Sequence, residues 1–306
     1  HWQPDAAFFL ESELWPVMLG EASRRGIPLA LVNGRMSPKS FESWQSRKLA
    51  ARELLSVFDV LIAQNDENAS RFSTLAGRSV GTAGNLKHAA EALPTPDGPM
   101  DEIRGWLGGR QIWLAASTHA GEEEIVLEAH RQVLAEMPGT LLVLAPRHPS
   151  RGDAVLSLCQ ERGFKVARRS AGEAVTDAHD VYLADTLGEL GIFYGISDIA
   201  FVGGSFLPIG GHNPLEPARL GCAILHGDKV FNFADTYAAM RRAGSAALVR
   251  NERDLAAALN RLLRDEMTRQ AMAEQARVWS EEGARSVLSG VLEALMPVLR
   301  KAGIAA

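Results

Sequence analysis

Short apolar runs alternate with longer amphipathic stretches along most of this chain, and this alternation sets the predicted architecture. Continuous apolar runs bounded by polar or Gly-containing segments predict buried strands, and apolar spacings of three and four predict the helices between them. The predicted strands lie at 6–10, 27–32, 60–63, 112–116, 141–145, 164–167, 181–183, 199–202, 223–226 and 247–249. Strands that alternate with helices form βαβ units around a mostly parallel sheet, so the predicted fold class is α/β.

The intervening stretches predict helices, and one Pro-rich segment, 92–99, predicts a linker between two strand–helix series. We therefore expect Rossmann-like domains at 1–91 and 92–282, followed by a C-terminal helix at 283–306. The Ala-, Glu- and Leu-rich stretch 265–302 predicts two helices. The other predicted helices lie at 42–58, 100–107, 122–137, 151–162, 187–197, 214–220, 233–243 and 252–263.

A Gly-rich loop after the strand at 199–202 is the strongest candidate for chemistry. Glycines without a Cβ let backbone amides approach a ligand closely. The loop leads into a helix start at Asn213, with Pro214 in the first turn and Glu216 three residues after the cap. A helix N-terminus suits a phosphate, but the same residues also form a capping box that needs no ligand. The glycines of the loop are Gly203, Gly204, Gly210 and Gly211.

Three further segments follow predicted strands, where open parallel sheets place their binding edge. The segment 117–123 is small, polar and Gly-containing, although Ser117 or Thr118 could simply cap the next helix. Arg147 and His148 follow the strand at 141–145 and offer donors to a phosphate. The third segment is 185–190, whose alternative explanation is a capping box of Thr186 and Glu189.

Composition narrows the class of protein. The chain has 306 residues, 46% of them hydrophobic, which is enough for one large core or two ordinary ones. Its net charge of −5 argues against a general nucleic-acid binder. Cys159 and Cys222 stand alone beside apolar residues, so they predict neither a disulfide framework nor a zinc site. No apolar run approaches the ~18 residues of a spanning helix, and no signal peptide is recognisable, so this chain is expected to be soluble.

The segment 210–218, Gly-Gly-His-Asn-Pro-Leu-Glu-Pro-Ala, resembles the signature of the 3-deoxy-D-manno-octulosonic acid (Kdo) transferases. Six other segments are similar to motifs of that family in the same order, from about residue 5 to 245. They are 11–16, 33–37, 84–87, 117–122, 185–189 and 227–233. Ser12, Gly34, Met36 and Leu187 are departures from the family pattern.

The resemblance implies a glycosyltransferase of the GT-B type, with two Rossmann-like domains facing a cleft and an incomplete N-terminal domain here. It implies inverting transfer of Kdo from CMP-Kdo onto a lipid A precursor, at the cytoplasmic face of the inner membrane. No metal or other cofactor is expected, and the absence of an Asp-x-Asp motif agrees with this. The domain 1–91 would bind the acceptor, 92–282 would bind CMP-Kdo, and the last helix would pack back on the first domain.

The resemblance also assigns roles to individual residues. Glu11 and then Glu13 would assist transfer, Lys87 would face the leaving phosphate, and Arg35 would bind the acceptor. In the donor site Glu216 would accept hydrogen bonds from the ribose hydroxyls. The whole implied donor set is Ser117, Pro146, Arg147, His148, Leu187, Gly188, Glu189, Gly211, His212, Asn213, Pro214, Leu215 and Glu216.

The general base remains without a clear candidate. Members of the resembled family place a glutamate base and a membrane anchor ahead of the segment with which this chain begins, and neither precedes His1. This chain is therefore expected to be part of a longer enzyme, to bind CMP and to transfer Kdo poorly or not at all. Two alternatives stay open: a nucleotide-sugar epimerase of the same fold, and a non-catalytic nucleotide-binding portion.

Overall fold

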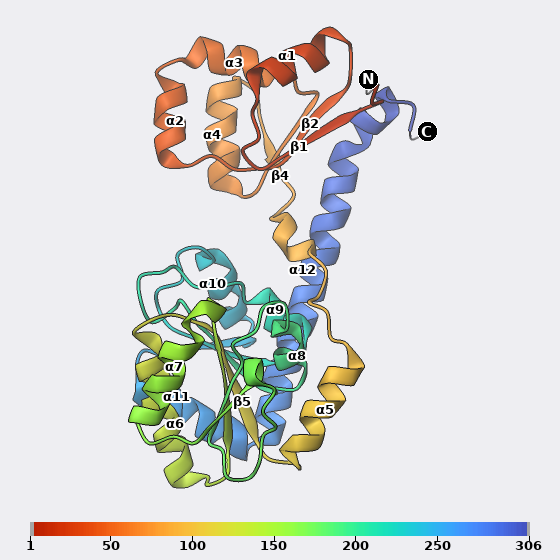
Figure 1. The fold of residues 1–306 in the computed structure, drawn as a ribbon. Coiled ribbons are helices and arrows are strands. Elements are labelled where there is room, and N and C mark those ends of the chain that lie inside the picture. The colour runs from red at the N-terminus through yellow and green to blue at the C-terminus, as the bar shows by residue number, and fades with distance from the viewer. Residues whose placement is uncertain (1–2, 305–306) are drawn as a thin grey trace. The chain divides into compact units, whose positions relative to one another are not determined.

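The computed structural model describes residues 3–304 and divides the chain into two compact units (Figure 1). Unit 1 comprises the chain up to Ala90 together with the segment from Glu282 onward. Unit 2 comprises Glu91–Glu281. Each unit is an α/β layer structure around its own parallel sheet.

Unit 1 is built on a four-stranded parallel sheet in the order β1-β2-β3-β4. One face packs against α1, α3 and α4 through residues such as Leu19, Leu55 and Phe72. On the other face, Val32 packs against Val287 and other residues of the C-terminal part of α12. The elements are β1 (Ala7–Leu10), α1 (Pro16–Arg24), β2 (Leu29–Gly34), α2 (Pro38–Gln45), α3 (Lys48–Ser56), β3 (Val60–Ala63), α4 (Asp66–Ala76), β4 (Gly81–Thr82), η1 (Leu86–Ala89) and the end of α12 (Glu266–Lys301).

Unit 2 holds a seven-stranded parallel sheet in the order β11-β10-β9-β5-β6-β8-β7. Its strands are β5 (Ile112–Thr118), β6 (Leu141–Pro146), β7 (Val166–Arg168), β8 (Val181–Leu183), β9 (Ile199–Val202), β10 (Ala223–His226) and β11 (Ala246–Leu248). Its helices are α5 (Asp97–Leu107), α6 (Glu122–Glu136), α7 (Gly152–Glu161), α8 (Leu190–Gly195), α9 (Leu215–Arg219), α10 (Ala234–Arg242) and α11 (Glu252–Arg264), with short 3₁₀ turns at Pro149–Arg151 and Arg169–Ala171.

Successive residues of a strand in unit 2 face different helices because side chains alternate across a sheet. Trp113 and Ala115 lie in a core cluster with residues of α6, α7 and α11. Leu114 and Ala116 lie in a second cluster with residues of α5 and α8. Burial on both faces is the reason that these strands appear in the sequence as continuous apolar runs.

The strand order reverses beside β5, and this places the binding edge of unit 2. The chain runs from β5 outward to β6, later crosses back, and places β9 on the other side of β5. Open α/β sheets bind ligands at such a reversal, so the loops that leave the carboxyl ends of β5 and β9 mark the candidate binding edge of unit 2.

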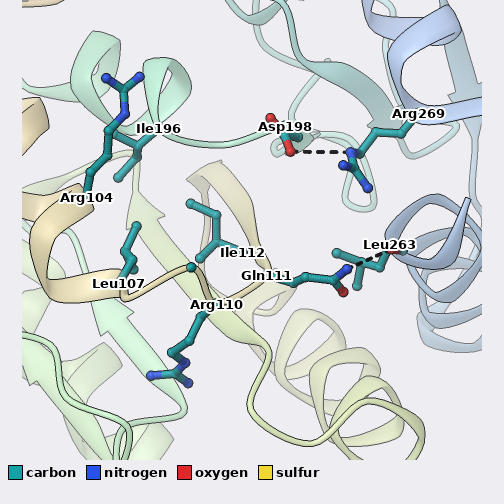
Figure 2. A pocket seen from close by; sticks show the side chains of 10 residues that line it. Arg104, Leu107, Arg110, Gln111, Ile112, Ile196, Asp198, Leu263 and Arg269 are labelled. Carbon is teal, nitrogen blue, oxygen red and sulfur yellow. Dashed lines mark hydrogen bonds and ion pairs between the residues drawn. The ribbon is translucent and has the colours of Figure 1, made fainter. Parts of the chain in front are cut away.

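A cavity of about 380 Å³ in unit 2 lies at the opposite edge, near the amino ends of β5 and β9. Its arginines do not converge on a common point (Figure 2). Arg104 donates to the Gly195 carbonyl, and Arg269 pairs with Asp198 at 3.3 Å. The first contact joins α5 to the end of α8, and the second joins α12 to the residue before β9, so we assign the cavity a structural role.

Two predicted helices differ from the structure. The stretch 42–58 is not one helix but two, α2 and α3, because the Ser46 hydroxyl bonds the Ser43 carbonyl and Arg47 leaves the helical region at φ −123° and ψ 43°. The stretch 265–302 is not two helices but the single α12, which continues through Pro297. Each part of α12 is fixed by its own core contacts, Ala276 in one cluster and Val287 in another.

Candidate functional site

Three non-glycine residues among those described have a positive φ: Glu11 (54°), Asn33 (57°) and Ser117 (56°). Each stands at or just beyond the carboxyl end of a strand, β1, β2 or β5. A positive φ is uncommon for Glu and Ser, and such outliers gather at functional sites. The backbone thus marks the same sheet edges that the sequence motifs mark.

The candidate catalytic residues of unit 1 meet at this edge. Lys87 Nζ lies 3.9 Å from Glu11 Oε1, although they are far apart in sequence. The Arg35 amide donates to the Glu11 carbonyl at 3.1 Å, and the Leu86 amide donates to Asn33 Oδ1 at 3.2 Å. Glu11, Lys87 and the backbone of Arg35 are therefore brought together.

Glu13 lies apart from this cluster. Its exposed carboxylate accepts a hydrogen bond of 2.6 Å from the Trp15 indole N–H. Within the segment 11–16, this local contact between Glu13 and Trp15 orients the Trp15 side chain, which is 58% exposed.

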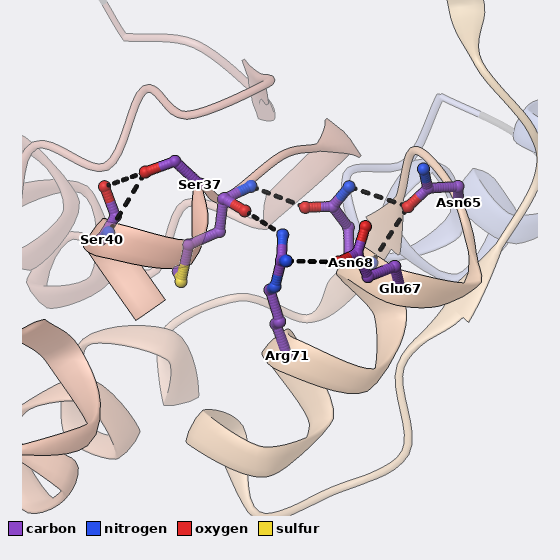
Figure 3. A network of polar contacts seen from close by, with 7 residues as sticks. Ser37, Ser40, Asn65, Glu67, Asn68 and Arg71 are labelled. Carbon is purple, nitrogen blue, oxygen red and sulfur yellow. Dashed lines mark hydrogen bonds and ion pairs between the residues drawn. The ribbon is translucent and has the colours of Figure 1, made fainter. Parts of the chain in front are cut away.

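A polar network holds the loop that carries Arg35 (Figure 3). Asn68 Oδ1 accepts from the Met36 amide at 2.7 Å, and Arg71 donates to the Met36 carbonyl at 2.6 Å. Asn65 caps α4 by accepting from the Asn68 amide at 3.0 Å, and Glu67 pairs with Arg71. This network anchors the backbone next to Arg35, whose own side chain is exposed.

In unit 2 three histidines from three strand ends converge. His119 Nε2 lies 2.8 Å from His212 Nε2, and the His148 ring stands edge-on to His119 with centroids 5.9 Å apart. Burial, with smaller contributions from His119 and Arg147, lowers the pKa of His212 to about 4. Burial also lowers the pKa of His119. His119 and His212 are therefore largely uncharged near neutral pH.

Glu216 lies beside this cluster on α9. Asn213 Oδ1 accepts from the Leu215 amide at 3.2 Å, and its side-chain amide donates to Glu216 Oε1 at 3.3 Å. With Pro214 already in the helical region, this is the helix-start chemistry that the sequence predicts, although α9 itself is short. Burial raises the pKa of Glu216, against the hydrogen bond from Asn213 and the charge of Arg147.

A cavity of about 130 Å³ lies at the carboxyl edge of the sheet, where Arg147 lines it. Four segments line it, and they include five residues of the predicted donor set: Ser117, Pro146, Arg147, Leu187 and Gly188. Leu187 is 83% exposed, so the cavity has an apolar side chain at its surface.

For two of the candidate segments the alternative explanation was a helix cap, and neither cap is formed at the start of its helix. Helix α6 begins after Gly121, without a side-chain cap from Ser117 or Thr118. Helix α8 begins at Leu190 rather than 187, because Gly188 has φ 83°. Glu189 instead accepts two bonds from Arg169, at 3.0 and 2.7 Å, and one from the Thr186 hydroxyl.

The sequence did not predict the contacts that Arg169 and Glu122 make. Arg169 lies in no motif, and its side-chain hydrogen bond lowers the pKa of Glu189. Glu122 accepts the amides of Gly204, Ser205 and Phe206. The amide of Gly204, one of the four loop glycines, is thus hydrogen-bonded to a carboxylate of the chain itself.

Several kinds of site are not found among residues 3–304. No group of three or more His, Cys, Asp and Glu side chains there has an arrangement that could hold a metal ion. Both cysteines are buried, and burial raises the pKa of Cys159 to about 12. Within the same residues no helix combines the length and apolarity needed to span a membrane.

Comparison with known proteins gives the family. A family model described as 3-deoxy-D-manno-octulosonic-acid transferase matches residues 1–90. The chain is 34% identical over 303 residues to the 3-deoxy-D-manno-octulosonic acid transferase of Haemophilus influenzae, covering 98% of this chain and 71% of that protein. The chain belongs to the Kdo transferase family. It is also 36% identical over 274 residues to a probable mitochondrial Kdo transferase of Arabidopsis thaliana.

The chain spans only part of its Kdo transferase relatives: 61% of the Arabidopsis protein and 56% of the Rickettsia felis protein. Among solved structures it resembles the C-terminal CMP-Kdo binding domain of WaaA from Acinetobacter baumannii. That match has 33% identity and a TM-score of 0.56 and covers 58% of this chain and 93% of that domain.

The two-domain GT-B-like fold is shared with more distant proteins. A UDP-GlcNAc 2-epimerase from Neisseria meningitidis matches with a TM-score of 0.59 at 14% identity, covering 95% of this chain and 76% of that structure. This similarity concerns the fold alone. The predicted α/β fold class and the predicted family are thus confirmed.

Proposed function

We propose that this chain is the CMP-Kdo-binding and acceptor-binding part of an inverting Kdo transferase that acts on a lipid A precursor. The observation that carries the proposal is that His119, His148 and His212 meet where the loops after β5, β6 and β9 come together. Arg147 is next to His148 in the chain, and Glu216 lies on the helix that follows His212. These groups match the parts of a nucleotide sugar: a cation and imidazoles for phosphate, and a carboxylate for ribose hydroxyls. The resemblance to a CMP-Kdo binding domain supports CMP-Kdo as the donor.

In the proposed reaction a hydroxyl oxygen of the acceptor attacks the anomeric carbon of Kdo from the face opposite CMP. A new carbon–oxygen bond forms, the bond from that carbon to the phosphate oxygen breaks, and CMP leaves with the electron pair. Arg147, His148 and His212 would stabilise the phosphate as it gains charge. Glu216 would orient the ribose.

Unit 1 would bind the acceptor. Arg35 offers a planar fork for a phosphate or carboxylate, and Lys87 beside Glu11 gives this edge a charge pair that a substrate could exchange. Glu11 already faces Lys87, so we do not assign it as the base that takes the hydroxyl proton. We propose that the parent enzyme works at the cytoplasmic face of the inner membrane, where its lipid acceptor lies.

Calorimetric titration with CMP and with UDP tests the donor site. Glu216→Ala should weaken CMP binding by roughly ten- to a hundredfold, since it removes charged-acceptor hydrogen bonds worth about 1.5–3 kcal/mol. Glu136→Ala is a matched control, because Glu136 lies on the surface and pairs with Arg264. A chain that prefers UDP would instead point to another nucleotide-sugar enzyme.

A transfer assay with CMP-Kdo and a lipid A precursor tests the reaction. We expect the 306-residue chain to bind CMP and to transfer Kdo slowly, because the general base is not assigned within it. Efficient transfer would refute that part of the proposal and would make Glu11 the first base to test, by Glu11→Gln.

A further inference from the structure

Glu122 is the last residue of the motif-like segment 117–122, but the sequence does not show where its side chain lies. It is the first residue of α6, and its side chain is fully buried between the loops that follow β5 and β9. Its two neighbours on the helix are different: Glu123 forms an ion pair with Arg151, and Glu124 has one oxygen without a hydrogen-bond partner among the described residues.

Both carboxylate oxygens of Glu122 receive backbone N–H groups. Oε2 accepts from the amide of His119 at 3.1 Å and from that of Gly204 at 2.7 Å. Oε1 accepts from the amides of Ser205 and Phe206, both at 2.9 Å. Successive amides that point into one concavity form an anion-binding nest, and here the anion belongs to the protein. All four partners are donors, so only an ionised carboxylate satisfies them all.

These four bonds join the loop that follows β5 to the loop that follows β9. One loop holds His119, and the other continues from Gly204 to His212 through two backbone bonds, Gly211 to the Gly204 carbonyl (2.7 Å) and His212 to the Gly203 carbonyl (3.3 Å). Glu122 therefore sets both sides of the 2.8 Å contact between His119 and His212.

Gly203 shows how closely the two loops approach. A Cβ at this position would stand 2.6 Å from the Ser117 carbonyl oxygen, which is backbone and cannot move aside cheaply. Glycine is therefore needed where the two loops meet, and Glu122 already occupies the four amides that a phosphate would otherwise use.

We propose that Glu122 is a positioning residue that takes the place of a ligand phosphate in the Gly-rich nest and thereby holds His119 and His212 in register at the donor site. The proposal rests on the proposed function for its ligand. It has a chemical consequence: the donor phosphate is recognised by side chains, Arg147 and the histidines, and not by the amides of residues 204–206.

The test uses Glu122→Gln, which keeps the shape but turns an N–H₂ group toward backbone donors. By NMR we expect the titration of His119 and His212 to move, because their contact depends on the loops that Glu122 joins. By calorimetry we expect CMP to bind at least about tenfold more weakly, which corresponds to the loss of one hydrogen bond to a charged group. Glu123→Gln is the matched control: it removes a buried carboxylate one residue away but leaves both loops joined, so CMP affinity should stay within about twofold.

The outcomes separate the two proposals. If the wild-type chain binds no CMP, the proposed function fails, while the histidine titrations still test Glu122. If Glu122→Gln is folded and keeps wild-type histidine titrations and wild-type CMP affinity, the positioning role is wrong. Should Glu122→Gln fail to fold, Glu122→Asp provides the same test, since it keeps the charge but is too short to reach all four amides.

Discussion

His130 ties α6 to the sheet through a single protonation state. The Trp113 indole N–H donates to His130 Nδ1 at 3.2 Å, so Nδ1 must be an acceptor. His130 Nε2, which then carries the proton, donates to the Asp180 carbonyl at 2.9 Å. A second proton on Nδ1 would face the indole N–H and break that bond. The ring is fully buried, and burial lowers its pKa to about 4.

This depressed pKa makes stability depend on pH in a stated direction. The unfolded chain takes up a proton near the ordinary value of 6.5, whereas the folded chain does so only near 4. His130 therefore contributes stability that is fully present above pH 6.5 and is lost as the pH falls toward 4. At 1.36 kcal/mol for each pKa unit the full loss is about 3 kcal/mol, and about 2 kcal/mol of it has occurred by pH 5.

Urea denaturation of the wild type and of His130→Gln between pH 8 and pH 5 measures this contribution. Glutamine stays neutral and can still accept and donate. The two proteins should show a constant difference in unfolding free energy above pH 7, which then shifts by about 2 kcal/mol in favour of the variant by pH 5. Buried His212 and His226 remain in both proteins, so their titration cancels. Parallel curves across the whole range would refute the reasoning.

Two further predictions concern Gly203 and His212 at the candidate site of unit 2. Gly203→Ala should destabilise the chain by about 1–3 kcal/mol, because the added Cβ would meet the Ser117 carbonyl. Gly105→Ala on α5 has open space around the added Cβ and should stabilise the chain by about 0.5–1 kcal/mol. Thermal denaturation of both variants measures these differences. CMP should bind more tightly to the wild type as the pH falls from 7 toward 5, because a bound phosphate raises the low pKa of His212. Calorimetry of His212→Gln should show a CMP affinity that depends less on pH. The same pH dependence in both proteins would contradict this prediction.

The strands could be predicted from the sequence because their burial on both faces leaves a direct trace. The runs at 60–63, 181–183, 199–202 and 223–226 coincide with β3, β8, β9 and β10. Helix ends were harder to predict, because they depend on side-chain bonds such as that of Ser46 and on left-handed glycines such as Gly188. A sequence pattern shows which residues could cap a helix but not which ones do.

The candidate site shows the same division. Arg147, His148, His212 and Glu216 could be proposed from sequence because each follows a strand, and parallel strands bring their carboxyl ends to one edge. Their ligands remain proposals. Arg169 could not be found in this way, since its pairing with Glu189 depends on how the loop after β7 folds.

The Gly-rich loop shows why a motif alone does not give a mechanism. Four glycines and a helix start predict a phosphate held by backbone amides, and the amides are indeed gathered as that reasoning requires. Their partner, however, is Glu122, more than 80 residues earlier in the chain and directly across the strand-order reversal. Supplying the anion internally keeps the loop ordered before any ligand arrives, so donor binding need not supply the free energy of ordering it. The glycines then allow the two loops to approach each other, and in the proposed donor site the side chains around Arg147 would select the nucleotide.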